Sequence, residues 1–263
     1  MLQDCMVHAL LSSKQGGYFV DLAANDAIIL SNTRALERDH GWRGLCIEPN
    51  PRYHAGLLQY RSCSVVDAAV SDSIGEVLFD FGAAEPSSSK VLDAGAFGRV
   101  VGNIGASVTR ASTARATWQV PIGPILEFHA APPTIDFMSL DVEGHEHHVM
   151  KVFPFERYNV SLLLIERPDR HLRRLLDRHG YMPLCSTPVD SLFAHWPPNN
   201  IAEWAVTPSC ASNLSFCWSQ TEPRCGSLVF PHVPACERAG RRRCMQRPPP
   251  LQRVCVSSLA HAY

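Results

Sequence analysis

The first two hundred or so residues alternate between short apolar runs and helix-like segments. The apolar runs have the length and composition of strands, and several are bounded by Gly, Pro, Ser or Asn. Strands are predicted over 18–22, 43–48, 64–70, 76–81, 135–141, 160–165, 181–184 and 189–195. Helices are predicted over 3–13, 31–39, 51–60, 122–129 and 169–178, with one more after Gly144.

Capping residues support these boundaries. Ser31, Asn32 and Thr33 offer side-chain oxygens to the start of the second helix, and Gly41 is placed to end it. Pro51 fits only the first turn of a helix, so it predicts that the third helix starts close to it.

The order of strands and helices predicts an α/β fold with a doubly wound, Rossmann-like sheet. Right-handed crossovers then place helices on both faces of the sheet. This domain is predicted to cover 1–204, and 82–117 is predicted to be a loop insertion because it is rich in Gly, Ala and Ser. After Trp204 no apolar period survives, so 205–263 is expected to be an irregular, disordered tail rich in Cys, Pro and Arg.

Composition excludes some partners. The chain has 263 residues and a formal net charge of −1, which gives no reason to expect binding to nucleic acid or an anionic membrane. No apolar run approaches the roughly 20 residues of a membrane span. The first residues lack the features of a signal peptide, so the default expectation is a cytoplasmic protein, with a targeting segment upstream of residue 1 left open.

The ten cysteines fall into two groups. Cys46 and Cys63 lie in or beside strand-like runs, where a cysteine is usually a small buried apolar residue. Six others lie in the tail, and their spacing lacks the short knuckle of a structural zinc site. An even number permits up to three disulfides there, and the sequence does not choose among them.

Four carboxylates follow strand-like runs: Asp21, Glu48, Asp141 and Glu166. Acidic residues are common at such junctions as caps, which is the simplest explanation for any single one. In a parallel sheet, however, ligands bind outside the carboxyl ends of the strands. Four acids at this edge therefore predict a ligand with positive charge and hydroxyl groups.

The loop after the first strand narrows the choice of ligand. A dinucleotide site needs G-x-G-x-x-G, and the stretch DLAANDA at 21–27 has no glycine. Asp26 would also repel a phosphate. A sulfonium nucleoside has no phosphate, carries positive charge and has a ribose for Glu48 to hold, so S-adenosylmethionine fits better than NAD or ATP.

At this point the chain resembles the FkbM-type S-adenosylmethionine-dependent methyltransferases. The resemblance covers about residues 3–196, and the motifs occur in the family's order. They are GYFVDLAAND at 17–26 with SNT at 31–33, GLCIEPNP at 44–51, AAVSDSIG at 68–75, IDFMSLDVEGHE at 135–146 and VDSLF at 189–193.

This resemblance implies a class I methyltransferase fold and a role for each part of the site. Asp21 and the loop through Ala23 and Asn25 would hold the methionine part of the cofactor, and Glu48 the ribose. Asp67 and Ala68 would lie near the adenine. Asp141 and Glu143 would border the pocket of the methyl acceptor.

Two positions depart from the family, which usually has glycine where this chain has Ala23 and Ala27. A methyl group there narrows the approach of the cofactor to the backbone. It also costs energy if φ is positive, whereas an alanine with negative φ is accepted.

The stretch DVEGHEHH at 141–148 is rich in His and carboxylates, which suits several divalent metals. The HExxH pattern fails because Val149 stands in place of the second His, and a solvated first helical turn explains the composition equally well. No metal is therefore predicted. For methyl transfer, His145 or Glu143 is the expected base and Asp141 a positioning group, with Glu166 as another candidate base or a structural anchor.

The sequence thus predicts an S-adenosylmethionine-dependent methyltransferase that acts on a hydroxyl of a small molecule or sugar. The acceptor class follows only from the family resemblance. Two alternatives stay open: a catalytically silent protein with the same fold that binds or traffics a partner, and a metal-assisted hydrolase that uses the His-rich turn.

Overall fold

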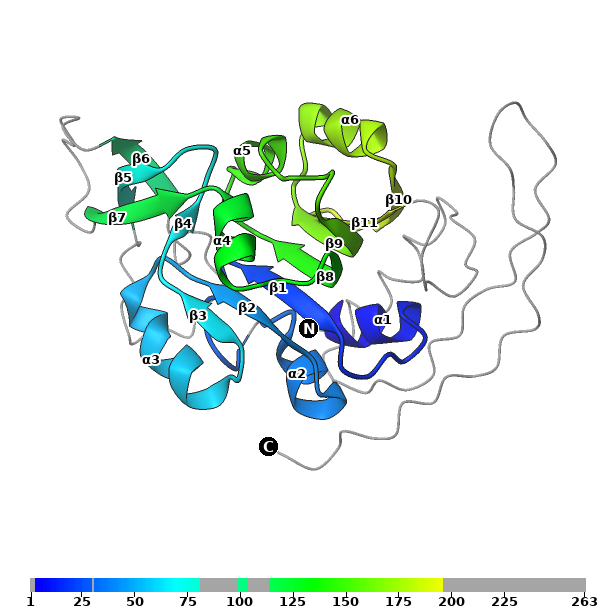
Figure 1. Ribbon diagram of the computed structural model, residues 1–263. Coiled ribbons are helices and arrows are strands. Elements are labelled where there is room, and N and C mark those ends of the chain that lie inside the picture. Colours follow the sequence, from blue (N-terminus) through cyan, green and yellow to red (C-terminus); the bar gives the residue numbers. More distant parts are fainter. Residues whose placement is uncertain (1–2, 30, 81–98, 104–113, 196–263) are drawn as a thin grey trace.

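The computed structural model describes residues 3–29, 31–80, 99–103 and 114–195 (Figure 1). The helices are α1 (Gln3–Leu10), α2 (Arg34–His40), α3 (Pro51–Tyr60), α4 (Ile122–Phe128), α5 (Glu146–Lys151) and α6 (Arg170–Arg178). The strands are β1 (Tyr18–Leu22), β2 (Arg43–Ile47), β3 (Ser64–Val66), β4 (Ala69–Val70), β5 (Gly75–Asp80), β6 (Arg99–Asn103), β7 (Ala114–Val120), β8 (Thr134–Leu140), β9 (Asn159–Glu166), β10 (Tyr181–Ser186) and β11 (Asp190–His195).

The main sheet has seven strands in the order β10-β11-β9-β8-β1-β2-β3. Strands β3, β2, β1, β8 and β9 pair in parallel, and β11 runs antiparallel to β9 and β10. The order reverses at β1, because the chain first builds outward to β3 and then returns to add β8 on the other side. The predicted doubly wound, Rossmann-like sheet is therefore confirmed.

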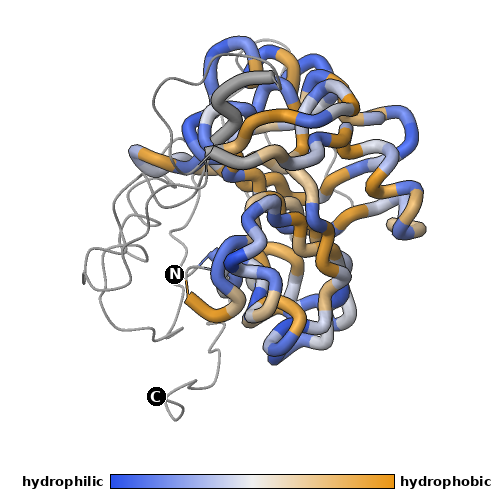
Figure 2. The backbone as a smooth tube through the Cα atoms, turned by 90° about the vertical axis from the view of Figure 1, so that its left-hand side faces the viewer, coloured by the Kyte–Doolittle hydropathy of each residue, from blue (hydrophilic) through white to orange (hydrophobic). Residues whose placement is uncertain are grey.

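Two apolar cores cover the two faces of this sheet. Helices α4, α5 and α6 pack on one face, and α1, α2 and α3 pack on the other (Figure 1). Neighbouring strand residues alternate between the cores, as Val20 and Phe19 do. Figure 2 shows hydrophobic residues concentrated along the interior strands and hydrophilic ones along the outer turns.

The local signals explain most helix boundaries. Helix α3 starts at Pro51, and the side chain of Asn50 accepts a hydrogen bond from the Arg52 amide. Gly41 ends α2 with φ 65°. Thr33 precedes α2 but makes no side-chain cap; its hydroxyl donates to Asp21 and accepts from Arg61.

A second, four-stranded sheet of order β4-β7-β5-β6 differs from the prediction. The expected strand over 64–70 divides after Val66, and its last two residues pair with β7. Strand β6 and most of β7 lie inside 82–117, the segment predicted to be a loop insertion. The rest of that segment and the tail 205–263 lie outside the described residues.

Cys46 and Cys63 form a disulfide bond. The expectation that each is merely a buried apolar thiol is therefore wrong, although both side chains do lie in the apolar core with α3. In the described ranges, no helix is long and apolar enough to cross a membrane.

Candidate active site at the carboxyl edge of the sheet

The carboxyl ends of the parallel strands meet at one edge of the main sheet. Four non-glycine residues just beyond β1, β8 and β9 have positive φ: Ala23 (60°), Asn25 (55°), Glu143 (52°) and Arg167 (40°). Such a backbone conformation is strained for residues with a side chain, and strain of this kind concentrates at functional sites. Ser12, Ser13 and Ala130 share this conformation elsewhere, so four of the seven such positions among the described residues lie at this edge.

A narrow pocket with a cavity volume of about 30 Å³ opens at the same edge. One wall is apolar and the other carries carboxylates and an imidazole. The lining residues are Ala23, Ile47, Pro49, Ala68, Ala69, Val70, Phe79, Asp141, Val142, Glu143 and His145.

Five of the nine predicted site residues line this pocket. The three expected catalytic residues, Asp141, Glu143 and His145, lie together on the loop after β8, and Ala23 and Ala68 face them from the β1 and β3 side. The other four residues predicted to hold the cofactor, Asp21, Asn25, Glu48 and Asp67, are not among the lining residues.

Glu48 braces the loops around the pocket. Its two carboxylate oxygens accept hydrogen bonds from the backbone amides of Asn25 (2.8 Å) and Asn50 (2.7 Å). Burial raises the pKa of Glu48 to about 7, and the two amides hold it from rising further. Glu48 therefore fixes the loop after β1 against the end of β2.

Asp21 is also turned toward the protein. Its carboxylate accepts a hydrogen bond from the Thr33 hydroxyl at 2.6 Å. Burial raises the pKa of Asp21, while the Arg61 guanidinium and hydrogen bonds to Thr33 and Ser139 act in the opposite direction. Asp21 thus connects the end of β1 to the start of α2 and to β8.

Arg61 is the centre of this buried polar network. The guanidinium donates to Glu37 (2.6 Å), Ser31 (3.0 Å) and Thr33 (2.7 Å). Only 1% of its side chain is exposed. The guanidinium suits this role because its several donors lie in a fixed plane, so one side chain serves acceptors on α2 and on the loop before it.

Asp67 lies on the outer rim. Its side chain is 65% exposed, and one oxygen is 3.7 Å from Nε2 of His54. The same His54 nitrogen is 2.7 Å from the backbone oxygen of Glu48. Asp67 is therefore near the end of β2 without lining the pocket.

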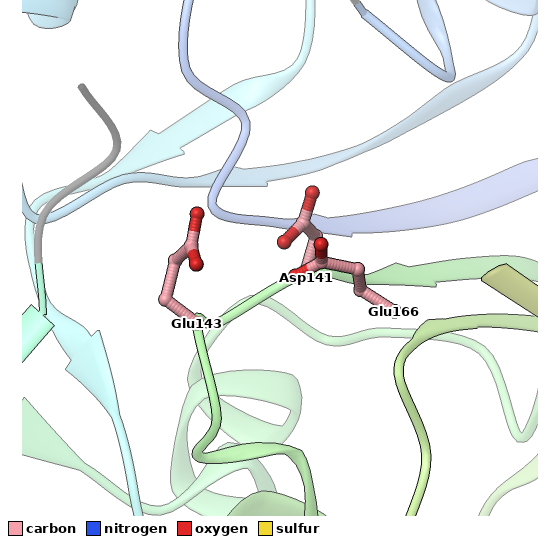
Figure 3. Close-up of side chains that lie close together, drawn as sticks. All are labelled: Asp141, Glu143 and Glu166. Carbon is pink, nitrogen blue, oxygen red and sulfur yellow. The ribbon is translucent and has the colours of Figure 1, made fainter. Parts of the chain in front are cut away.

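Three carboxylates converge at the ends of β8 and β9. One oxygen from each of Asp141, Glu143 and Glu166 lies within 4.8 Å of the others, which is close enough to share a cation (Figure 3). Burial, a hydrogen bond to Glu166 and the charge of that residue raise the pKa of Asp141 well above its usual range. Oδ1 of Asp141 is buried without a hydrogen-bond partner. A proton on Asp141 relieves the repulsion between these groups.

The charge of the cluster extends to β11 and the next loop. Burial and the nearby Glu166 raise the pKa of Asp190 to about 6. Arg167 places a guanidinium nitrogen 2.9 Å from the Glu166 carboxylate. No Lys or Arg is among the described pocket-lining residues, so the pocket wall favours positive or neutral ligand groups.

His145 is the imidazole of the pocket. Burial lowers its pKa, and the nearby His148 lowers it further, so the ring is neutral at pH 7 and able to accept a proton. Glu146 shapes this turn, because its carboxylate accepts hydrogen bonds from the amides of Val142 (3.2 Å) and Gly144 (3.0 Å).

Sequence reasoning missed two parts of the site. The apolar wall includes Val70 and Phe79 from the second sheet, whose pairing across distant segments has no local signal. Arg61 stands at the end of α3 without any motif around it. A buried charge cannot be recognised from sequence spacing alone.

The comparisons with known proteins agree with the resemblance. The sequence profile of the methyltransferase FkbM domain matches residues 21–183, more than half of the chain. The chain therefore belongs to the FkbM methyltransferase family. No curated protein matches it.

Among solved structures, the chain is similar to a precorrin-6Y C5,15-methyltransferase from Geobacter metallireducens GS-15. The identity is 12% and the TM-score 0.38, over 73% of this chain and 86% of that one. A similarity at this level does not define a shared activity or substrate.

Proposed function

We propose that this protein transfers a methyl group from S-adenosylmethionine to a hydroxyl group of a small molecule or sugar. The observation that carries the proposal is the pocket at the switch point of the sheet, which has an apolar wall facing an acidic one. Membership of a methyltransferase family supports the same reaction.

The residues present fit this cofactor. Ile47, Ala68 and Val70 offer apolar contacts to an adenine ring, and Asp141 and Glu143 offer negative charge to the cationic methionine end. Glu48 remains a candidate for the ribose, since each of its oxygens accepts one backbone hydrogen bond and has a second lone pair.

When bound, S-adenosylmethionine supplies an electrophilic methyl group on a positively charged sulfur. The protein then has two tasks: to align an acceptor hydroxyl and to take its proton. His145 is the proposed base, because its ring is neutral and lines the pocket. Glu143 is the second candidate, and Asp141, when protonated, would orient the acceptor through a hydrogen bond.

One observation favours the alternative of a catalytically silent protein. Ala23 has φ 60°, the conformation in which an alanine is strained and a glycine is not. The methyl group of Ala23 also narrows the approach of a cofactor to the backbone of this loop. The metal-assisted hydrolase has weaker support. Asp141 and Glu143 of the stretch 141–148 line the pocket, but of its three His residues only His145 does.

The test is methyl transfer from isotopically labelled S-adenosylmethionine to a panel of hydroxyl compounds, with each product examined by mass spectrometry. The proposal requires that one acceptor class gains a labelled methyl group on oxygen. Binding of the cofactor without transfer to any acceptor would favour the silent protein instead.

A further inference from the structure

The disulfide between Cys46 and Cys63 ties together two segments that border the pocket. Cys46 lies in β2, directly before Ile47 of the pocket wall, and Cys63 lies directly before β3. Their Cα atoms are 5.8 Å apart, a normal separation for a disulfide. The bond closes a loop that contains the end of β2 and all of α3.

Strand β3 is held only weakly by its pairing within the sheet. It is the edge strand of the main sheet and pairs with β2 over only three positions. The chain then leads directly into Ala68, Ala69 and Val70, which line the pocket. A short edge strand is held by few hydrogen bonds and opens easily, so without the bond this wall of the pocket loses its support.

The same turn carries the polar anchor of the site. Arg61 donates to Glu37, Ser31 and Thr33, and the amide of Ser62 also donates to the Glu37 carboxylate. Residues 61–63 thus connect the turn by hydrogen bonds to α2 and by a covalent bond to β2. The disulfide is the only part of this anchor that depends on the redox environment.

Burial determines how the bond responds to reductants. Cys46 is fully buried and Cys63 is 8% exposed. Thiol–disulfide exchange requires a thiolate to reach a sulfur atom, so the folded chain has to open locally before a reductant can attack. Reduction of the folded domain is therefore slow, because it requires local opening.

We propose that the Cys46–Cys63 disulfide is a redox lock. While it is oxidised, it holds β3 against β2 and so supports the pocket wall at this edge of the sheet. Oxidising conditions close the lock during folding, and a dithiol reductant opens it. In the opening reaction the S–S bond breaks, the two cysteines gain two electrons and two protons, and the reductant becomes a disulfide. The chain then suits an oxidising environment, in contrast to the cytoplasmic default expected from the first residues.

The cross-link is tested first by tryptic digestion of the non-reduced full-length protein. Cleavage after Arg43, Arg52, Arg61 and Lys90 places Cys46 in peptide 44–52 and Cys63 in peptide 62–90. We expect these peptides to appear as one covalent species that separates on reduction. Free thiols at both positions in protein purified from an oxidising host would overturn the proposal.

The lock is tested by comparing oxidised, reduced and reoxidised protein. Reduction is expected to lower the Tm by about 5–10 °C and to weaken S-adenosylhomocysteine binding about tenfold, and reoxidation should restore both. The variant Cys46→Ala/Cys63→Ala is the control, because a dithiol should leave its Tm unchanged. Equal Tm values for oxidised and reduced wild type would overturn the lock.

The peptide and Tm measurements do not depend on the proposed function, whereas the binding measurement does. If the cross-link and the Tm shift are found but the oxidised protein binds no S-adenosylhomocysteine, the lock stands and the methyltransferase proposal fails. If oxidised and reduced protein bind equally well, the lock does not control the pocket.

Discussion

The two sides of the pocket are built in opposite ways. On the β2 side, Arg61 pairs with acceptors on the α2 approach, Glu48 is held by two amides, and a disulfide fixes β3. On the β8–β9 side, carboxylates crowd together and Oδ1 of Asp141 is buried without a partner. The first side is a stable frame, and the second keeps electrostatic repulsion that a cationic ligand would relieve.

The largest expected effect comes from breaking the frame. Arg61→Met leaves Glu37 and Asp21 without their buried cation, so we expect a loss of about 3–5 kcal/mol in the free energy of unfolding. Urea unfolding measures it. Arg157→Met is the control, because Arg157 forms an exposed ion pair with Glu127, and its loss should leave stability unchanged. Equal effects of the two variants would show that the buried network does not stabilise the frame.

The next effect concerns catalysis on the acidic side. His145→Gln is expected to lower the rate of methyl transfer about 100-fold or more while S-adenosylhomocysteine affinity stays the same. Because burial lowers the pKa of His145, the wild-type rate should be flat above neutral pH and fall in acid as the ring gains a proton. His171→Gln, at an exposed position of α6 outside the pocket lining, is the control. If His145→Gln keeps the wild-type rate of methyl transfer, His145 is not the base and Glu143 becomes the candidate.

A smaller effect concerns how the stability of the fold depends on pH, through buried carboxyls on both sides of the pocket. The folded pKa of Glu48 is about 7, that of Asp190 about 6, and that of Asp141 is also raised. The unfolded chain releases these protons at lower pH than the folded chain does, so stability should fall as pH rises from about 5 to about 8.

Asp141→Asn replaces one of these titrating carboxyls by an amide that does not titrate. The amide can still donate a hydrogen bond to Glu166. We expect its Tm to exceed that of wild type by about 3 °C at about pH 8 and to match it at about pH 5. Asp177→Asn, at an exposed position of α6, is the control and should change the Tm at neither pH. If a chelator lowers the wild-type Tm instead, the cluster holds a cation and not a shared proton.

The smallest effect tests the strained loop. Ala23→Gly relieves the positive φ and should stabilise the fold by about 0.5–1 kcal/mol. Ala27→Gly is the matched control: Ala27 is buried and is absent from the positive-φ positions, so glycine there should destabilise by a similar amount. Thermal unfolding of both variants gives the sign, and stabilisation by both would show that the strain at Ala23 is not the cause.

Local signals in the sequence predicted much of the fold. The apolar run at 160–165 became β9, and Pro51 gave the start of α3. These features depend on residues that are close together in the chain, so a short stretch of sequence is enough to predict them. Strand β6 and its pairing with β5 could not be predicted, because the pairing joins distant segments and lies in a region without apolar periodicity.

The site was predictable in part for the same reason. Strand ends located Asp141, Glu143 and His145, which do line one pocket. The sequence could not tell which acids face the pocket, because the choice depends on partners such as Thr33 and Arg61 that arrive from other elements. Nor could spacing alone pair Cys46 with Cys63 among ten cysteines.

Calorimetric titration with S-adenosylhomocysteine tests the central claim, that the pocket between the β1–β3 and β8 loops holds an adenosyl cofactor. Oxidised wild type is expected to bind with a Kd of about 1–100 µM, as is usual for enzyme ligands. Ala68→Leu, which adds bulk to the apolar wall, should weaken binding at least about tenfold while its Tm stays within about 3 °C of wild type. No heat from wild type at high micromolar ligand, or equal affinity in Ala68→Leu, would contradict the claim.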